Sequence, residues 1–190
     1  MTYSWLFAGL WGVWMVSWGV AAIWASKPAA RPPDREELFH WGVLTVGSVL
    51  LFLNFKTGRS DMLWSTPDAY EWALFAIAVA GLAFAWWARI HLGTLWSGRV
   101  TRKADHRVVD SGPYGIVRHP IYTGLIAAML ATALLRPGPF GLAGVALIAL
   151  SFVIKYRLEE RFLMEELGPQ YAAYRTRVPA LVPFWPMRGK

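Results

Sequence analysis

A short stretch between residues 112 and 124 concentrates the side chains that could do chemistry in this chain. It reads Gly-Pro-Tyr-Gly-Ile-Val-Arg-His-Pro-Ile-Tyr-Thr-Gly and leads directly into an apolar run that ends at Leu135. Charged and ring-nitrogen groups such as Arg118 and His119 are costly at the edge of an apolar segment unless they face protein or water. We therefore interpret the stretch as a candidate functional site. The competing interpretation is a snorkelling arginine and an interfacial histidine beside an aromatic belt.

A second candidate is the pair of adjacent carboxylates, Glu159 and Glu160, which follows the last apolar run. Taken alone, the pair fits a solvated helix face whose charge is balanced by Arg157 and Arg161. However, the carboxylates lie where an apolar helix should end, opposite a loop rich in Arg and His. A ligand with an ammonium, a sulfonium or ribose hydroxyls would find acceptors there. A carboxylate on the same ligand would find Arg118 and the neighbouring histidine.

Other site chemistries find little support in the sequence. His91, His106 and His119 fit no common ligand spacing and no carboxylate pair brackets them, so a metal site is not expected. A glycine-rich dinucleotide motif after a strand, a Walker lysine and a serine-hydrolase elbow are all absent. The chain contains no cysteine, which excludes disulfides, thiolate nucleophiles and cysteine-based metal sites.

The elements that must position these residues are apolar helices. Hydrophobic residues make up 56% of the chain and charged residues 16%, against about 45–50% and about 25% in soluble domains. We read the first apolar run as a retained helix, because it lacks the basic start of a signal peptide. Runs without Asp, Glu, Lys or Arg, each about as long as a bilayer core requires, predict five membrane-spanning helices. These runs are residues 1–26, 38–55, 72–88, 119–135 and 137–154.

The last helix should continue past the membrane. Apolar residues recur at helical spacing after Ile154, with charges between them, until Gly168 and Pro169 interrupt the pattern. This predicts a cytoplasmic C-terminal helical extension that carries the two glutamates, followed by a short helix over residues 170–177. The expected fold is a single all-α integral membrane domain over residues 1–190, with the cofactor-site half at about 89–190.

Basic residues predict the orientation. Under a five-helix topology with an outside N-terminus, sixteen of the nineteen Lys and Arg residues fall on one side. The positive-inside rule places that side, with the third loop and the C-terminal tail, in the cytoplasm. We expect a multi-pass protein of the cell inner membrane. The net charge of +7 is explained by this bias and by anionic membrane lipids, so no nucleic-acid partner is expected.

Taken in order, these motifs resemble the isoprenylcysteine carboxyl methyltransferase family. The resemblance covers about the last hundred residues, whereas the first three helices are similar only in being hydrophobic. Four groups of residues carry it, and in chain order they are Leu92-Gly93-x-x-Trp96-Ser97, then Ser111-Gly112-Pro113-Tyr114-x-x-x-Arg118-His119-Pro120-x-Tyr122-x-Gly124, then Glu159-Glu160-x-x-Leu163, and finally Gly168-x-x-Tyr171-x-x-Tyr174 with Arg177-Val178-Pro179.

The resemblance implies a membrane enzyme that uses S-adenosylmethionine and releases S-adenosylhomocysteine. The methyl group would pass to the head group, expected to be a carboxylate, of a lipid-like or prenylated acceptor. A loop arginine (Arg89, Arg99, Arg102 or Arg107) could orient that head group. We predict catalytic roles for Arg118, Glu159 and Glu160. The predicted cofactor-binding residues are Tyr114, Val117, Arg118, His119, Pro120, Tyr122, Glu159 and Glu160.

Small residues suggest where the acceptor would enter. The helix expected after Pro120 carries the small residues Gly124, Ala127, Ala128 and Ala131. Small residues allow a neighbouring helix or a lipid tail to approach closely. We therefore predict a lateral opening from the bilayer at this face, with the cofactor entering separately from the cytoplasm.

Three alternatives remain at this stage. The Arg-His-Pro-x-Tyr-x-Gly core also resembles membrane sterol reductases that use NADPH, and phospholipid N-methyltransferases. Such reductases usually carry many more membrane helices and a cysteine-containing stretch, whereas this chain has no cysteine and has a Glu-Glu pair. These differences favour methyl transfer over reduction. In the third alternative the chain is a non-catalytic scaffold whose polar cluster only anchors helix ends.

Overall fold

The computed structural model describes residues 2–24, 35–53, 62–93 and 108–184, and over these residues the chain is helical and has no strand. The apolar runs predicted from the sequence coincide with the long helices, so the all-α prediction is confirmed. The long helices are α1 (Thr2–Ala21), α2 (Arg35–Leu53), α3 (Asp68–Leu92), α4 (Pro120–Leu135) and α5 (Pro139–Arg177), and the short 3-10 turns are η1 (Ala22–Trp24) and η4 (Gly112–Gly115).

Helix length supports three membrane spans directly. α2, α3 and α5 are long and apolar enough to cross a membrane, whereas the apolar part of α1 (Trp5–Ala21) and α4 are shorter. The 16 residues of α4 reach about 24 Å at about 1.5 Å per residue, less than the roughly 30 Å of a hydrocarbon core. Pro120 sets the start of α4, and Pro137 follows soon after its end, which keeps it short. The prediction of five spans is therefore supported for three helices.

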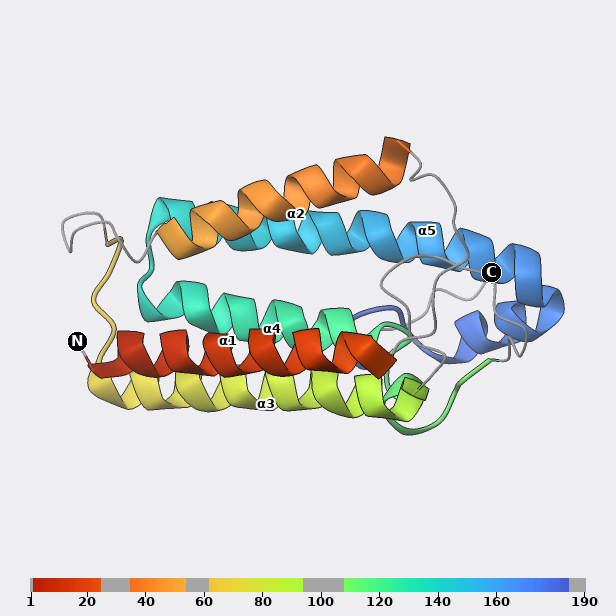
Figure 1. Cartoon of the computed structure of the whole chain (residues 1–190), viewed down its shortest axis with the longest axis horizontal. Coiled ribbons are helices and arrows are strands. Elements are labelled where there is room, and N and C mark those ends of the chain that lie inside the picture. Colours follow the sequence, from red (N-terminus) through yellow and green to blue (C-terminus); the bar gives the residue numbers. More distant parts are fainter. Residues whose placement is uncertain (1, 25–34, 54–61, 94–107, 185–190) are drawn as a thin grey trace.

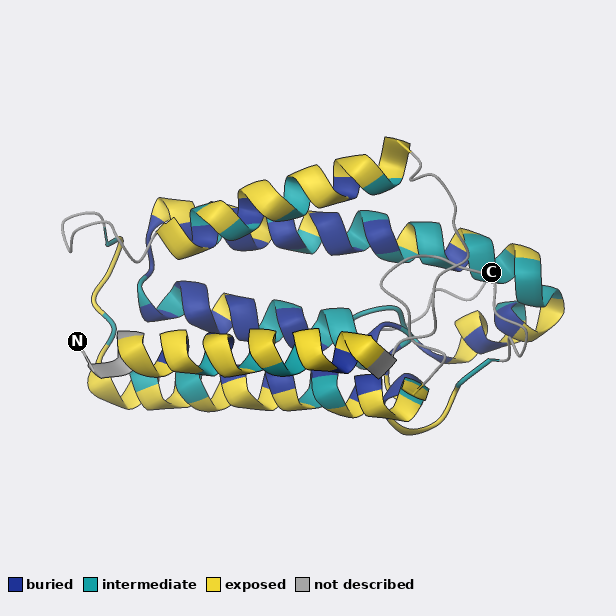
Figure 2. Cartoon of the chain, viewed as in Figure 1, coloured by how far each residue is buried: buried dark blue, intermediate teal, exposed yellow. Residues whose placement is uncertain are grey.

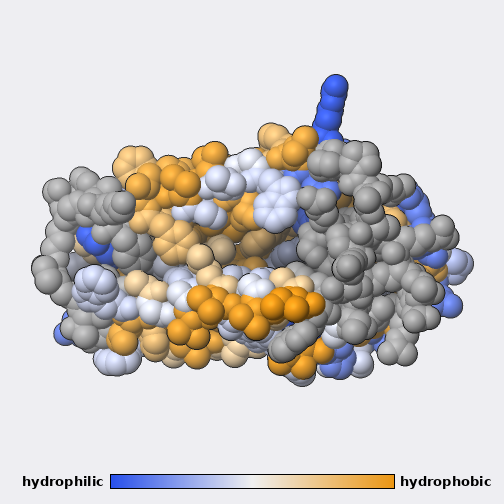
Figure 3. Space-filling view, viewed as in Figure 1, coloured by the Kyte–Doolittle hydropathy of each residue, from blue (hydrophilic) through white to orange (hydrophobic). Residues whose placement is uncertain are grey.

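The long helices form two antiparallel pairs. α2 packs along α5, α3 packs along α4, and α1 lies beside α3 (Figure 1). The indole of Trp11 in α1 also donates a hydrogen bond to Thr132 of α4 at 3.0 Å. Large apolar side chains cover much of the outer surface (Figures 2 and 3), and Val13, Ile77 and Ile90 are examples. An exposed apolar surface of this extent suits hydrocarbon better than water.

Both helix pairs cross at glycines. A Cβ atom on Gly124 of α4 would lie 2.3 Å from the carbonyl oxygen of Gly81 in α3, and one on Gly144 of α5 would lie 2.7 Å from that of Gly47 in α2. Small residues permit this close backbone contact. The small face of α4, including the fully buried Ala128, therefore meets a neighbouring helix. The predicted tail entrance at this face is wrong, because α3 seals it.

Replacing Gly124 by alanine is expected to destabilise the protein by about 1–3 kcal/mol, since the added methyl must push two helix backbones apart. Thermal unfolding in detergent measures the loss. The matched control is Gly42→Ala in α2, where a Cβ atom would meet nothing within 4 Å. Equal melting temperatures for the two variants would contradict the close crossing.

The end of α5 turns back toward the start of α4. Gly168 interrupts the helix with a φ of 51°, and Pro169 follows, as the sequence predicted. The segment after Arg177 then runs beside the loop that precedes α4. The amides of Arg118 and His119 donate to the carbonyls of Pro179 at 2.8 Å and Ala180 at 3.0 Å. Two chain segments about sixty residues apart are thereby joined by backbone hydrogen bonds.

Candidate active site at the start of α4

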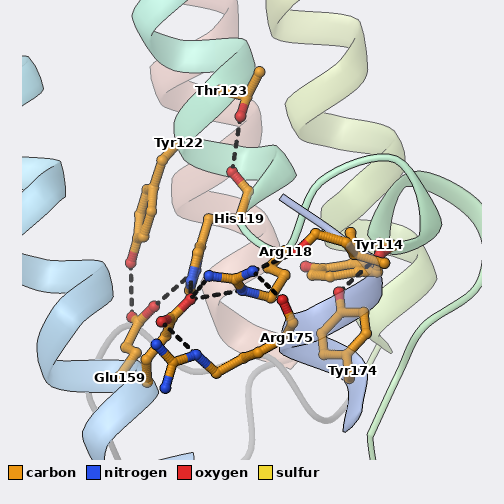
Figure 4. Close-up of polar contacts among 10 residues, drawn as sticks. Tyr114, Arg118, His119, Tyr122, Thr123, Glu159, Tyr174 and Arg175 are labelled. Carbon is orange, nitrogen blue, oxygen red and sulfur yellow. Dashed lines mark hydrogen bonds and ion pairs between the residues drawn. The ribbon is translucent and has the colours of Figure 1, made fainter. Parts of the chain in front are cut away.

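The polar cluster lies where the loop before α4 faces α5 (Figure 4). His119 immediately precedes the helix and has a φ of −124° and a ψ of 62°, because Pro120 disfavours helical geometry in the residue before it. Glu159 projects toward His119 from α5. The fold thus brings together the two motifs that the sequence analysis singled out.

Glu160 is held by three basic side chains. Its Oε1 accepts a hydrogen bond from Arg118 Nε at 2.7 Å and lies 3.1 Å from His119 Nε2, while its Oε2 lies 3.3 Å from Arg175 Nε. The side chains of Arg118 and Glu160 are 9% and 8% exposed. A carboxylate this deeply buried requires charged partners to offset its lost hydration. Glu160 therefore ties the α4 entrance to α5.

Arg118 also caps the C-terminal end of α5. Its Nη1 donates to the carbonyl oxygen of Arg175 at 3.2 Å and to that of Val178. Carbonyl groups at a helix C-terminus lack intrahelical partners and favour a positive charge. We expected Arg118 to receive a ligand carboxylate, whereas its guanidinium binds Glu160 and backbone carbonyl oxygens.

Glu159 is the more accessible of the two carboxylates. Its Oε1 accepts a hydrogen bond from the Tyr122 hydroxyl at 2.7 Å, and its Oε2 lies 3.6 Å from His119 Nδ1. The side chain of Glu159 is 22% exposed. The Tyr122 ring stacks between His119 at 5.8 Å and Phe152 at 4.9 Å. This packing orients the hydroxyl and the imidazole toward one carboxylate.

The imidazole ring of His119 lies between the carboxylates of Glu159 and Glu160. Burial lowers the pKa of His119, but hydrogen bonds and charge from Glu159 and Glu160 outweigh burial, so that pKa is raised above its usual 6.5. Because the folded pKa exceeds the unfolded one, protonated His119 stabilises the fold. That stabilisation is complete below the unfolded pKa and is lost as the pH rises through the raised value.

We expect His119→Gln to lower the melting temperature more at pH 6 than at pH 9. Glutamine cannot carry the charge that the two carboxylates favour, so the variant loses a stabilisation that the wild type has only when protonated. Thermal unfolding of both proteins across this pH range measures the difference. If the difference in melting temperature between the two proteins does not change with pH, the conclusion that His119 is protonated in the folded protein is wrong.

Three tyrosines form an aromatic wall beside the cluster. The Tyr174 hydroxyl donates to the carbonyl oxygen of Tyr114 at 2.7 Å, and the ring of Tyr171 packs edge-on against that of Tyr174 at 5.8 Å. Burial raises the pKa of all three phenols. They are therefore neutral at physiological pH and offer flat surfaces and hydroxyls.

One cavity of about 1010 Å³ joins this polar end to the apolar interior. Part of its opening is visible as a hollow between α1 and α2 in Figure 3. Cavities of this size enclose drug-sized or larger ligands. The polar end is lined by Tyr114, Arg118, His119, Tyr122, Glu159 and Tyr171, and the apolar end, named here the aromatic groove, by Trp11, Trp14, Trp18, Trp41, Leu44, Phe52, Leu125, Met129 and Phe152.

A sequence model described as the isoprenylcysteine carboxyl methyltransferase (ICMT) family matches residues 73–165, which contain most of α3, all of α4 and the part of α5 that bears both glutamates. Several relatives of known name are also similar to the chain. The chain resembles the ICMT family over residues 73–165. This confirms the resemblance found in the sequence and favours a methyltransferase over the reductase alternative.

The relatives carry different acceptor names. A methanethiol S-methyltransferase from Mycobacterium tuberculosis is 42% identical over 75% of this chain and 51% of its own length. The cobalt-zinc-cadmium resistance protein CzcN from Cupriavidus metallidurans is 31% identical over 78% of this chain and 64% of its own length. Protein-S-isoprenylcysteine O-methyltransferase B from Arabidopsis thaliana is 32% identical over 45% of this chain and 44% of its own length. The chain thus spans 44–64% of these relatives.

The predicted site residues separate into two groups. Tyr114, Arg118, His119, Pro120, Tyr122 and Glu159 line the cavity. Val117 is fully buried in the core, and Glu160 instead lines a second groove with Arg175. Among the described residues no group of three His, Asp or Glu side chains could hold a metal ion.

The loop arginines suggested for the acceptor head group are placed only in part. Arg89 is buried, and its guanidinium donates to the carbonyl oxygens of Ala21 at 2.8 Å and Gly93 at 3.3 Å. It joins the end of α1 to the end of α3 and does not line the cavity. Arg99, Arg102, Arg107, His106 and the Trp96–Ser97 part of the family motif lie outside the described residues.

Sequence reasoning missed three contributors to the site. Arg175 pairs with Glu160, the carbonyls of residues 178–181 bind the Arg118 loop, and Lys155 lines the cavity. Lys155 could have been found, because it precedes Glu159 by four residues and so shares its helix face. Backbone carbonyls leave no side-chain pattern to read.

Proposed function

We propose that this chain transfers a methyl group from S-adenosylmethionine to the head group of a hydrophobic acceptor in a membrane. The match to the ICMT family and the methyltransferase names of the relatives support methyl transfer. The observation that carries the proposal is the single cavity that runs from Glu159 and His119 into the aromatic groove. The apolar outer helix faces and the bias of basic residues support a membrane protein whose polar end faces the cytoplasm.

The residues at the polar end suit this methyl donor. Glu159 presents a partly exposed carboxylate that can accept hydrogen bonds from an ammonium group or ribose hydroxyls. The rings of Tyr114 and Tyr171 can pack against an adenine. S-adenosylmethionine supplies both the methyl carbon and the leaving group: a lone pair of the acceptor forms the new bond, the carbon–sulfur bond breaks, and its electron pair stays on the sulfur of S-adenosylhomocysteine.

The protein's contribution is alignment and exclusion of water. Tyr122 and His119 fix the Glu159 carboxylate, while the Arg118–Glu160 pair fixes the wall behind it. Holding two reactants in line in a shielded site removes much of the entropic cost of a bimolecular reaction. A carboxylate acceptor is ionised at neutral pH and needs no general base. The names of the relatives extend the candidate acceptors to thiols.

Glu159→Gln is expected to weaken S-adenosylhomocysteine binding roughly ten- to a hundredfold, the usual cost of losing a charge-assisted hydrogen bond. Calorimetric titration of the purified protein measures the affinity. Glu165→Gln, at an exposed position on the same helix, is the matched control and should bind as the wild type does. Wild-type affinity in Glu159→Gln would contradict the assignment of this carboxylate.

NADP is the second ligand for the same titration. We expect S-adenosylhomocysteine to raise the melting temperature of the wild-type protein and NADP to leave it unchanged, because only a ligand that binds the folded state stabilises it. Stabilisation by NADP alone would support the reductase alternative, and stabilisation by neither would support the scaffold.

A further inference from the structure

Lys155 is a buried cation on the cavity wall that the proposed reaction does not use. It is 3% exposed and lines the cavity from α5, one helical turn before Glu159. Its Nζ makes no hydrogen bond to any described residue. A lysine ammonium carries three donors and is costly to bury when they are unsatisfied. The position therefore calls for an acceptor that the described part of the chain does not supply.

The charged and titratable groups around Lys155 do not provide this acceptor. Among the described residues, the nearest carboxylate oxygen is Glu37 Oε1 on α2, which lies 3.7 Å from Nζ and makes no hydrogen bond to any of them. His40 of α2 directs Nδ1 to Ser151, whose hydroxyl lies at 2.7 Å and carbonyl at 3.0 Å. Glu159 is engaged by Tyr122 and lies near His119. The Glu37 contact is an ion pair that leaves the ammonium donors available.

Lys155 stands at the boundary between the two halves of the cavity. Phe152 precedes it by almost one turn at the end of the aromatic groove, and Glu159 follows it by one turn, about 6 Å along the helix axis. Two other lining side chains can carry positive charge, and both are engaged: Arg118 by Glu160 and backbone carbonyls, and His119 by Glu159 and Glu160. An amphiphile with its tail in the aromatic groove would place its head beside Lys155.

We propose that Lys155 binds the carboxylate of the acceptor and thereby selects hydrophobic carboxylic acids. This inference rests on the proposed function, since it assigns the acceptor half of the same cavity. The ammonium offers charge-assisted hydrogen bonds to an anion in a site shielded from water, where such bonds are strongest. A neutral or cationic head group would leave the buried ammonium unsatisfied and is therefore discriminated against.

Binding of dodecanoate, with dodecanol as the neutral probe of equal length, tests the inference. Radiolabelled probes are bound to the protein in phosphatidylcholine nanodiscs, and empty nanodiscs give the background. Lys155→Met should weaken dodecanoate binding roughly tenfold or more and leave dodecanol binding unchanged. Lys155→Arg, which keeps the charge, should retain most of the dodecanoate affinity.

Glu37→Gln distinguishes a binding role from a structural one. If Lys155 binds the acceptor, removing the competing carboxylate should tighten dodecanoate binding. Lys155 could instead serve only to pair with Glu37 and hold α2 against α5. In that case Glu37→Gln and Lys155→Met should both lower the melting temperature, and neither should change the preference for dodecanoate over dodecanol. That second result would overturn the inference, and Glu37→Gln gives an answer even if Lys155→Met does not fold.

S-adenosylhomocysteine binding by the same samples separates this inference from the proposed function. A protein that binds S-adenosylhomocysteine but binds dodecanoate and dodecanol equally well would overturn the role of Lys155. The methyl-transfer proposal would still stand. Dodecanoate binding that depends on Lys155, in a wild-type protein that fails to bind S-adenosylhomocysteine, would support the anion site and overturn the methyl-transfer proposal.

Discussion

Arg118→Met is expected to lower the free energy of unfolding by about 3–5 kcal/mol, the usual cost of removing one partner from a buried ion pair. Methionine fills part of the space of the arginine side chain but leaves the buried carboxylate of Glu160 with His119 and Arg175 only. It also removes the donor to the carbonyls of Arg175 and Val178 at the end of α5. Denaturant titration of the purified protein measures the loss.

The double variant Arg118→Met with Glu160→Met separates electrostatics from packing. If the unpaired carboxylate causes most of the loss, removing it as well should restore part of the stability. A double variant that is less stable than Arg118→Met would show that Glu160 still stabilises the fold through His119 and Arg175. If Arg118→Met loses less than about 1 kcal/mol, the Arg118–Glu160 pair contributes no more to stability than an exposed salt bridge does. That result would contradict the prediction.

Shortening the acceptor tail should have the other large effect. Each buried methylene contributes about 0.8 kcal/mol, so an acceptor four methylenes shorter should lose about 3 kcal/mol, or roughly two hundredfold in kcat/KM. The aromatic groove is the surface that such a tail would bury. Methyl transfer to a homologous series with one head group measures the dependence. The KM for S-adenosylmethionine should stay constant along the series.

A flat response to tail length would mean that the groove does not hold the acceptor and that the apolar helices only anchor the protein. The groove is lined by residues of α1, α2, α4 and α5, and Gly124 is not among them. Trp14→Ala, which truncates a lining side chain, should reduce kcat/KM for long-tailed acceptors more than for short ones. Equal reductions for both would argue against tail contact at this position.

Much of the architecture could be predicted because it rests on strong local signals. Charge-free runs identified the helices, and Gly168 with Pro169 marked the break in α5. The side-chain cluster was predictable because Arg118, His119 and the two glutamates are unusual beside apolar segments. The small residues of α4 indicated close approach but not the partner, since Gly124 fits a helix and a lipid tail equally well. The backbone partners of Arg118 could not be predicted, because carbonyl groups have no sequence signature.

The backbone bonds from residues 179–180 to the Arg118 loop also set an order of assembly. Arg118 and Val178 are sixty residues apart along the chain, and every long helix precedes the later of the two. During synthesis the helix pairs can form while this contact is still absent, because it requires the chain beyond α5 to emerge and turn back. Contacts of long sequence separation are slow to form, since chain entropy must be lost first. The polar end of the cavity is therefore completed last, after the apolar groove.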